Sequence, residues 1–153
     1  MSLDAATREA IRGLRKRHDG EGRLAAVEAL RRVQAAHRWV SDAHLAETAA
    51  LLGMTEAELD SLATFYSLIF RRPVGERLIL LCDSLPCWMA GSEALRARLR
   101  ERLGIDFGET TEDGRYTLVN ICCVGACDAA PAALRDFALV APAGVEALLE
   151  DGP

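Results

Sequence analysis

Long apolar runs are missing from this sequence, and positive charge is nowhere concentrated. No stretch reaches the roughly 18–20 consecutive apolar residues that a membrane-spanning helix requires. Residues 1–18 are charged and helical in pattern, without the apolar centre and cleavage site of a secretory signal. The 18 basic residues are scattered rather than gathered into the basic stripe of a nucleic-acid-binding protein. We expect a soluble cytoplasmic protein that neither inserts into a membrane nor binds nucleic acid.

The sequence also lacks a C-x-x-C motif, which argues against a thiol–disulfide exchange protein. Its three histidines, His18, His37 and His44, lie away from the cysteines, and we interpret them as surface or hydrogen-bonded helix residues. A Rieske-type centre, in which two histidines replace two cysteines, is therefore not expected. In the reducing cytoplasm, clustered cysteines more often hold a metal than form disulfides.

Residues 1 to about 70 have the apolar spacing of packed helices. Leu24, Val27, Leu30 and Val33 recur at helical spacing, with Arg and Glu on the opposite face. Half of the 153 residues are hydrophobic, which is enough for one average domain or two small ones with packed cores. This half of the chain is therefore expected to form a helical bundle.

Two later helices of this half have clear start signals. Ser41 is placed to cap a helix that Gly53 ends. Thr55 and Glu58 form a capping-box sequence for a helix predicted over residues 56–69. The aromatic side chains of this half are interpreted as bundle core rather than as an electron conduit: Trp39, Phe65 and Tyr66.

The pattern changes after the breaker-rich hinge Arg-Arg-Pro-Val-Gly at residues 71–75. The elements expected beyond it are a buried strand at 77–81, a helix at 91–103, a strand at 116–121, one or two strands within 133–140, and a helix with Pro142 in its first turn that ends near Glu150. This order is that of an α/β sandwich of thioredoxin-like size. We predict an α+β or α/β protein with a helical bundle domain at residues 1–73 and a thioredoxin-like domain at 74–153.

Four of the five cysteines form two closely spaced pairs. Cys82 and Cys87 stand as C-x4-C, and Cys123 and Cys127 stand as C-x3-C. Cys122 directly precedes the second pair, and its x4 spacing to Cys127 leaves the register of that pair open. Four thiolates in two pairs form the ligand set that an iron–sulfur cluster needs. If the strands before the two pairs are parallel neighbours, both loops leave the same edge of the sheet, and the simplest allocation gives one iron to each pair.

The residues around the cysteines add expectations about hydrogen bonding and charge. Gly125 lets the backbone approach sulfur closely, and we expect amides within residues 83–85 and 124–126 to point at the thiolates. Pro86 has no amide hydrogen and is expected to shape the loop before Cys87. The acids that follow ligand cysteines would lower the reduction potential if they faced a cluster, and otherwise are solvated loop residues: Asp83 and Asp128.

Two other interpretations of the cysteines stay open. A structural zinc site also uses four thiolates, although zinc knuckles usually have C-x2-C spacing. Scattered core cysteines explain five thiols in many proteins, but they do not explain two spaced pairs beside Gly or Pro at the ends of strands.

The cysteine pairs stand in a longer frame of short segments: Trp39-Val40-Ser41, Leu-Leu-Gly-Met-Thr at 51–55, Ala-Thr-Phe-Tyr-Ser at 63–67, Arg-Pro-Val-Gly at 72–75, Thr-Thr-Glu-Asp-Gly-Arg-Tyr-Thr-Leu at 110–118, and Ala130-Pro131. This frame runs from about residue 22 to the end. It resembles the E subunit of the proton-pumping NADH:quinone oxidoreductase (respiratory complex I), a thioredoxin-like [2Fe–2S] ferredoxin. Residues 2–20 depart most from the family.

The resemblance implies one [2Fe–2S] cluster with Cys82, Cys87, Cys123 and Cys127 as ligands, and it leaves Cys122 outside the ligand set. It implies an electron-transfer subunit of an NADH-oxidising complex, with no catalytic residue or substrate pocket of its own. The cluster would exchange one electron with the flavin of a flavin- and NADH-binding partner subunit, in a peripheral arm that holds further iron–sulfur subunits. The helical half, residues 1–73, would be the docking element.

The resemblance extends to related complexes. Subunits of NAD-reducing hydrogenases and of NAD-dependent formate dehydrogenases look alike and have a similar cysteine frame, so an equivalent role in one of those complexes is the alternative. A free ferredoxin-like carrier is a further hypothesis, but a diffusing carrier needs no docking bundle.

Overall fold

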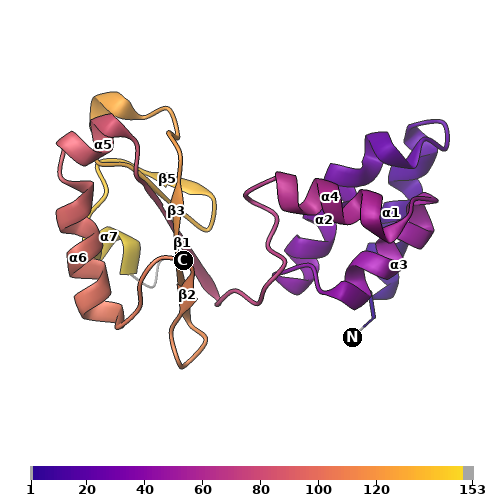
Figure 1. Ribbon diagram of the computed structural model, residues 1–153, viewed down its shortest axis with the longest axis horizontal. Helices are drawn as coiled ribbons and strands as arrows, with labels where there is room; N and C mark the ends of the chain where they lie inside the picture. Colours follow the sequence, from indigo (N-terminus) through magenta and orange to yellow (C-terminus); the bar gives the residue numbers. More distant parts are fainter. Residues whose placement is uncertain (1, 150–153) are drawn as a thin grey trace. The chain divides into compact units, whose positions relative to one another are not determined.

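A computed structural model of the chain describes residues 2–149, and the chain divides into two compact units, Met1–Pro73 and Val74–Pro153. In Figure 1 the first unit runs from indigo to magenta and the second continues through orange to yellow. Each unit has a hydrophobic core made of its own residues. No helix within residues 2–149 is both long enough and apolar enough to cross a membrane.

The described part of the first unit consists of helices α1 (Ala5–Arg17), α2 (Gly22–His37), α3 (Asp42–Leu52) and α4 (Glu56–Phe65). The predicted caps are confirmed. The Ser41 side chain accepts a hydrogen bond from the His44 amide, and Gly53 ends α3 in the left-handed conformation. Thr55 and Glu58 form both halves of the capping box.

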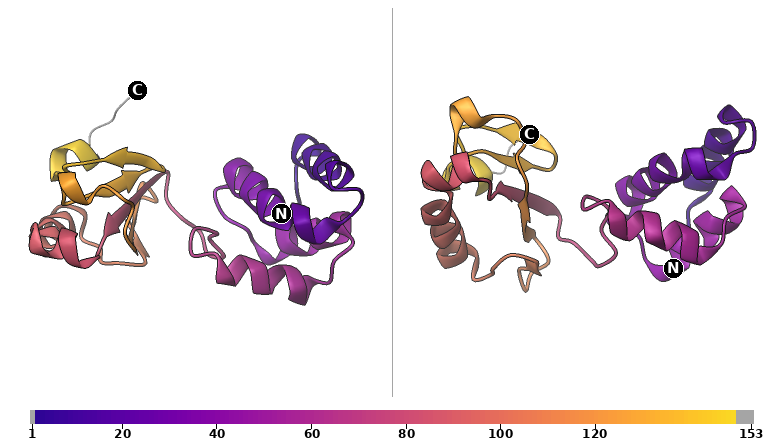
Figure 2. Two further views of the ribbon diagram at one scale, coloured as in Figure 1. Left: turned by 90° about the horizontal axis from the view of Figure 1, so that it is seen from above. Right: turned by 45° about the horizontal axis from the view of Figure 1, so that its top comes forward.

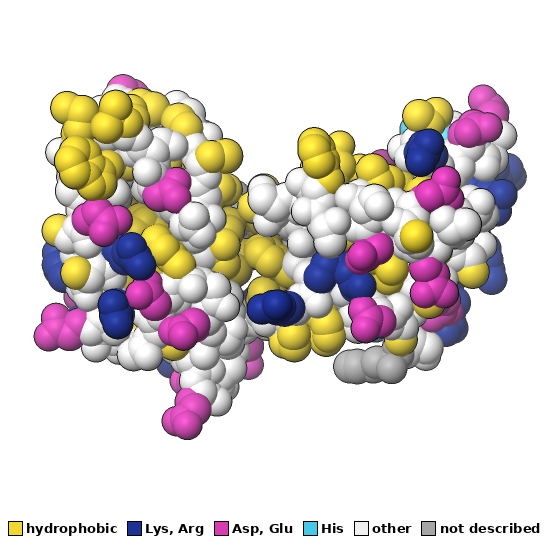
Figure 3. Space-filling view, in the orientation of Figure 1, with side chains coloured by type: hydrophobic (Ala, Val, Ile, Leu, Met, Phe, Trp, Pro, Cys, Tyr) yellow, Lys and Arg dark blue, Asp and Glu magenta, His cyan; other side chains and the backbone are white. Residues whose placement is uncertain are grey.

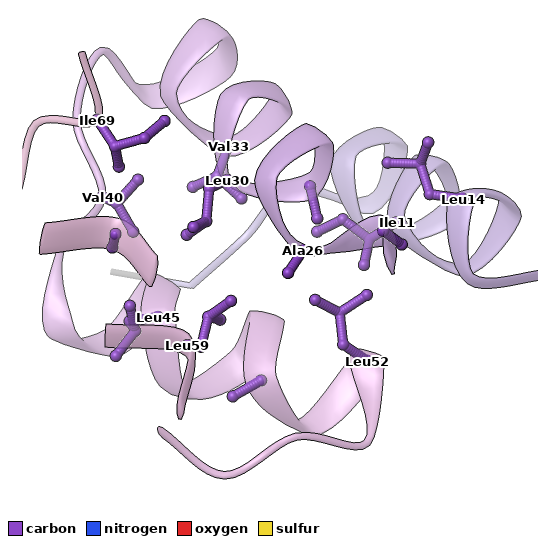
Figure 4. Packing of buried hydrophobic residues seen from close by; sticks show 14 of the residues in the cluster. Ile11, Leu14, Ala26, Leu30, Val33, Val40, Leu45, Leu52, Leu59 and Ile69 are labelled. Carbon is purple, nitrogen blue, oxygen red and sulfur yellow. The ribbon is translucent and has the colours of Figure 1, made fainter. Parts of the chain in front are cut away.

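The core of this unit lies between all four helices, which contribute Ile11, Leu30, Leu52 and Leu59 among others (Figure 4). The predicted apolar face of α2 is wrong at Leu24, whose side chain is 68% exposed. The buried face of α2 instead contains three of its five alanines, Ala25, Ala26 and Ala29, together with Leu30 and Val33. Because alanine side chains are small, this face lets neighbouring helices approach closely, and periodicity that counts only large apolar residues misplaces it.

Helix α4 ends earlier than predicted, at Phe65 rather than near Ile69. Residue Gln34 of α2 explains this, because its side chain donates to the Leu68 carbonyl (2.8 Å) and accepts from the Phe70 amide (2.7 Å). These two bonds hold the chain in a non-helical path. The interpretation of Phe65 and Tyr66 as core is also wrong, since both side chains are exposed.

The interpretation of the histidines as surface or hydrogen-bonded residues is wrong for His44. Its side chain is 1% exposed, and within the described residues neither ring nitrogen makes a hydrogen bond of regular geometry, although the Trp39 backbone lies near enough to influence the ring. The ring lies 4.3 Å from that of His37, measured between centroids. Burial, followed by the charge of His37, lowers the pKa of His44, so the buried ring is held neutral.

The second unit is built on a five-stranded sheet with the order β2-β3-β1-β4-β5. The strands are β1 (Arg77–Cys82), β2 (Glu109–Thr110), β3 (Tyr116–Ile121), β4 (Ala133–Arg135) and β5 (Ala138–Val140). Strands β1 and β3 are parallel, and the remaining neighbours are antiparallel. The strands predicted at 77–81 and 116–121 and within 133–140 are confirmed, whereas β2 was not predicted because two residues carry no periodicity.

The helices of this unit are α5 (Leu85–Met89), α6 (Ser92–Leu103) and α7 (Val145–Leu149), with a 3-10 turn, η1, at Cys127–Ala129. Leu99 of α6 and Leu148 of α7 pack with Ile79 and Leu118 of the sheet in one core cluster, and Figures 1 and 2 show α6 on one side of the sheet. Helix α6 confirms the prediction at 91–103. The prediction for Pro142 is wrong, because α7 begins only at Val145, and the predicted end near Glu150 lies outside the described residues.

Candidate metal centre

The two cysteine loops leave neighbouring parallel strands at the same edge of the sheet. In the register between β1 and β3, Cys82 is opposite Ile121, so both strands end at the same level. The loops are then tied together, because the Asp83 amide donates to the Ile121 carbonyl at 3.1 Å. The predicted parallel pairing is confirmed, and it places both cysteine pairs where open α/β sheets bind ligands.

The first pair is buried. Cys82 is the last residue of β1, and Cys87 lies on α5, with each side chain 1% exposed. The prediction of a loop around Cys87 is thus replaced by a short helix with Pro86 in its first turn, where a missing amide hydrogen costs nothing. The Cys82 and Cys87 side chains belong to the same buried cluster, and each influences the pKa of the other. The two thiols therefore stand side by side at one edge of the site.

The second pair is exposed and lies on the loop after β3. The Cys123 and Cys127 sulfurs are 3.4 Å apart, and the Gly125 amide donates to the Cys123 sulfur at 3.4 Å. Gly125 has a φ of 85°, a left-handed conformation that favours glycine. The expected approach of backbone at Gly125 is confirmed.

Backbone amides and neighbouring thiols together set the acidity of the cysteines. Burial raises the pKa of Cys82, but hydrogen bonds from the backbone and side chain of Ser84, from Cys87 and from the Val124 amide outweigh it, so the net pKa of Cys82 is lowered. Burial raises the pKa of Cys87, and the charges of Cys82 and Cys123 raise it further. Amide donors at sulfur stabilise the thiolate form, which is the form that binds metal.

The interaction of the two loops is also visible in Cys127. Its hydrogen bond with Cys123 raises the pKa of Cys127, and the charges of Cys87 and Cys82 contribute in the same direction. The thiols of the two loops are therefore close enough for their charges to interact across the site.

The donor set fits a two-iron cluster. All five cysteines are free, and four of them form the two pairs Cys82–Cys87 and Cys123–Cys127. Within residues 2–149, no group of three or more Cys, His, Asp or Glu side chains is arranged to hold a single metal ion. A small apolar shell, drawn mainly from Val124, Ala126, Ala130 and Ala132, surrounds the buried pair. Such a shell keeps water and competing donors away from the sulfurs.

The acids beside the cysteines are exposed, as the solvated interpretation requires. The Asp83 carboxylate accepts a hydrogen bond from the Asn120 side chain at 2.9 Å, which fixes its position on the edge of the sheet. Asp128 lies in η1. Cys122 follows directly after β3, where its side chain is exposed.

The influence of Ala132 and of the Ser84 side chain was missed by sequence reasoning, whereas the Ser84 amide lies in the segment expected to point at sulfur. The backbone of Ala132 acts to lower the pKa of Cys87, and Ser84 acts to lower the pKa of Cys82 through both its backbone and its side chain. Ser84 is the N-cap residue of α5, and a Ser placed two residues before a Pro is a recognisable helix start. Nothing in the sequence signals Ala132, because its role depends only on the backbone position that the sheet imposes.

Comparison with known proteins agrees with this geometry. Residues 11–150 match the family described as thioredoxin-like [2Fe-2S] ferredoxin. The E subunit of the NADH-quinone oxidoreductase of Pseudomonas aeruginosa is 43% identical over 136 residues, which cover 87% of this chain and 82% of that protein. The protein of the same name from Escherichia coli K12 is 41% identical over 153 residues, covering 98% and 92%.

Two solved structures are similar in fold. The NAD+-reducing [NiFe]-hydrogenase in the H2-reduced state has a TM-score of 0.70 and 26% identity over 80% of this chain, and the air-oxidized state has 0.62 and 28% over 68%. The present chain spans only 20% and 18% of those hydrogenase chains. The likeness therefore concerns one module of a much longer protein.

Proposed function

Because the chain belongs to the thioredoxin-like [2Fe–2S] ferredoxin family, we propose that it is the electron-transfer subunit of an NADH-oxidising complex, of the NADH:quinone oxidoreductase type. One observation carries the proposal: two cysteine pairs lie at the carboxyl ends of the neighbouring parallel strands β1 and β3. Identity above 40% to E subunits of NADH-quinone oxidoreductases over nearly the whole chain supports the choice of complex.

The proposed ligands are Cys82 and Cys87 for one iron and Cys123 and Cys127 for the other. When bound, a [2Fe–2S] cluster accepts and donates single electrons. The chain's own contribution is to hold four sulfurs in place and to direct the Gly125 amide at one of them, while the backbones of Ser84, Val124 and Ala132 act to lower the pKa of the buried cysteines. Hydrogen bonds to the sulfurs are one of the levers by which a protein tunes the reduction potential.

The proposed partner is a flavin- and NADH-binding subunit whose flavin exchanges one electron with the cluster, within a peripheral arm that contains further iron–sulfur subunits. In this arrangement the chain lies peripheral to the inner membrane and has no substrate site of its own. We assign docking to the helical unit, residues 1–73. The exposed aromatic pair Phe65 and Tyr66, with ring centroids 5.3 Å apart in an edge-to-face arrangement, supports this assignment.

A second candidate is the equivalent subunit of an NAD-reducing hydrogenase, which the fold similarity to the two hydrogenase structures favours. An NAD-dependent formate dehydrogenase would use the same kind of module. The genes beside this one decide between them: a flavoprotein gene followed by many membrane-subunit genes indicates respiration, whereas hydrogenase or formate dehydrogenase genes indicate the alternatives.

The cofactor is tested by purifying the chain without oxygen and measuring iron, inorganic sulfide and zinc. We expect a reddish-brown protein with about two irons and about two sulfides per chain and a one-electron paramagnetic signal on reduction. A colourless protein with stoichiometric zinc would instead support a four-cysteine zinc-binding module and defeat the proposal.

The ligand set is tested by changing each cysteine singly to alanine. Cys82→Ala, Cys87→Ala, Cys123→Ala and Cys127→Ala should each lose the cluster absorbance or strongly disturb it. Cys122→Ala is the matched control, because its side chain is exposed and only one residue from a proposed ligand. Loss of the cluster in Cys122→Ala with retention in Cys123→Ala would mean that the second pair has the other register.

A further inference from the structure

An exposed apolar patch lies directly beside the buried cysteine pair. Leu85, Trp88 and Met89 of α5 are 66%, 58% and 74% exposed, although they flank the buried Cys87. Spacings of three and four residues place them on one face of the helix. Figure 3 shows hydrophobic side chains gathered over α5, at the upper left. Large apolar side chains grouped in this way on a soluble protein mark interaction sites.

Acidic residues predominate near this patch. The two segments that build the site, residues 78–95 and 116–134, contain no Arg or Lys and contribute the exposed acids Asp83 and Asp128, whereas Glu93 is paired with Arg96 at 3.7 Å. The second unit as a whole has 7 of the 18 basic residues but 13 of the 23 acidic ones. The cysteine site thus opens on an apolar surface whose rim carries the exposed acids Asp83 and Asp128.

We propose that the α5 patch, Leu85, Trp88 and Met89, is the surface on which the flavin-bearing partner docks, and that the partner presents an apolar centre rimmed by Lys or Arg. Charge complementarity selects this occupant, because an acidic rim repels an acidic partner and attracts a basic one. This inference rests on the proposed function and adds to it, since it gives the second unit a docking surface besides the one assigned to residues 1–73.

The position of the patch gives it a direct role in electron transfer. Trp88 and Met89 follow Cys87 immediately in the sequence, so a partner that binds to them contacts the chain directly beside a proposed ligand. Tryptophan is enriched among the residues that dominate interface energies, because it buries a large rigid surface. A contact at this place would also exclude water from the buried side of the site.

The test uses the cluster-bearing chain and the flavin- and NADH-binding subunit from the same gene cluster, purified separately. Affinity is measured for Trp88→Ala and Met89→Ser, and we expect each to weaken binding about tenfold or more. Phe137→Ala is the matched control, because Phe137 is 51% exposed on the same unit, and it should bind as the wild type does. Asp128→Asn should slow association, and added salt should slow the wild type in the same way.

The outcomes separate this inference from the proposed function. Cluster absorbance and the paramagnetic signal are recorded for every variant. If Trp88→Ala loses the cluster, Met89→Ser still tests the docking surface. Unchanged affinity in both cluster-bearing variants would overturn the docking surface and leave the proposed function standing. A wild-type chain that forms dimers lost in Met89→Ser would show that a second copy covers the patch, which also overturns it. An iron-free wild-type protein would overturn both the docking surface and the proposed function.

Discussion

The two cysteine pairs differ in their access to solvent. Cys82 and Cys87 are shielded by the apolar shell, whereas Cys123 and Cys127 are exposed on the loop after β3. A reagent that attacks thiols therefore reaches the second pair first. Since Cys122 is exposed but lies outside the proposed ligand set, it provides an internal reference for reactivity.

Alkylation patterns should follow this difference. In the cluster-bearing protein we expect iodoacetamide to modify Cys122 alone, because a thiolate bound to iron is protected. In the cluster-free protein the exposed Cys123 and Cys127 should react next, and the buried Cys82 and Cys87 last. Peptide mass spectrometry after timed quenching measures the order. Protection of Cys122 in place of Cys123 would contradict the proposed register.

Gly125 should be needed for the cluster beyond its effect on stability. Gly125→Ala places a side chain at a φ of 85°, which costs about 1–2 kcal/mol and turns the amide away from the Cys123 sulfur. Gly108→Ala is the matched control, because its φ is 81° and nothing lies near either added methyl group. Both variants should lose similar stability, while only Gly125→Ala should release iron faster to a chelator. Equal iron release would show that strain alone is responsible.

His44 should make the stability of the helical unit depend on pH. Its pKa is lowered in the folded protein, so its contribution is complete above the unfolded value of about 6.5 and is lost as the pH falls below it. Asp4 and Glu47 are the carboxylates near the His37 and His44 rings, and both stay ionised in this pH range. The hydrogen bonds from Thr7 lower the pKa of Asp4 to about 2, and the contact with Arg8 lowers the pKa of Glu47.

This dependence is measured by urea unfolding between about pH 7.5 and about pH 5.5, in wild type and in His44→Leu. The wild type should lose stability on acidification, and His44→Leu should lose less. His18→Gln is the control and should behave as the wild type does, because His18 is not in contact with the His37 and His44 rings. If the free energy of unfolding depends on pH in His44→Leu as it does in the wild type, the effect comes from His37 or from other groups.

Two helical glycines in the first unit predict opposite effects of the same substitution. Gly22 begins α2 against the Leu52 carbonyl, and an added methyl group would overlap that oxygen. Gly13 lies in α1 with open space around it. Gly22→Ala should therefore destabilise the unit by about 1–3 kcal/mol, as overpacking does. Gly13→Ala should stabilise it by about 0.5–1 kcal/mol through helix propensity. Thermal unfolding compares the two, and a stable Gly22→Ala would contradict the close approach of α2 to α3.

Long elements were predictable, whereas short ones and ends were not. Helix α6 and strands β1 and β3 follow from apolar spacing over six residues or more. Helix α5 has five residues, too few for a helical period, and the site depends on it because it carries Cys87. The early end of α4 is decided by Gln34, which lies 34 residues before the carbonyl that it binds. A local pattern holds no information about such a partner.

At the level of the whole chain, the two hydrophobic cores should unfold as separable units. Leu59 is fully buried in the core of residues 3–69, and Leu99 is fully buried in the core of the second unit. Each change to alanine should cost its own unit about 2–5 kcal/mol. Trp39 and Trp88 report on the first and the second unit, so single-tryptophan variants follow each transition by fluorescence. A shift of both transitions in Leu59→Ala would show that the units unfold together.

The amino-acid sequence by itself determined the order of the long helices and strands and the two cysteine pairs, while the choice of Cys123 over Cys122 as a proposed ligand rests on the family resemblance. Apolar spacing, caps and cysteine spacing are local signals, and they survive without knowledge of distant contacts. Tertiary structure decided what depends on partners far along the chain. The burial of Cys87 on α5, the burial of His44 and the exposure of Phe65 were decided in this way. The reason is physical: burial and hydrogen bonding at a residue are set by whichever segments the fold brings beside it, and the residue's own neighbours in the sequence do not specify those segments.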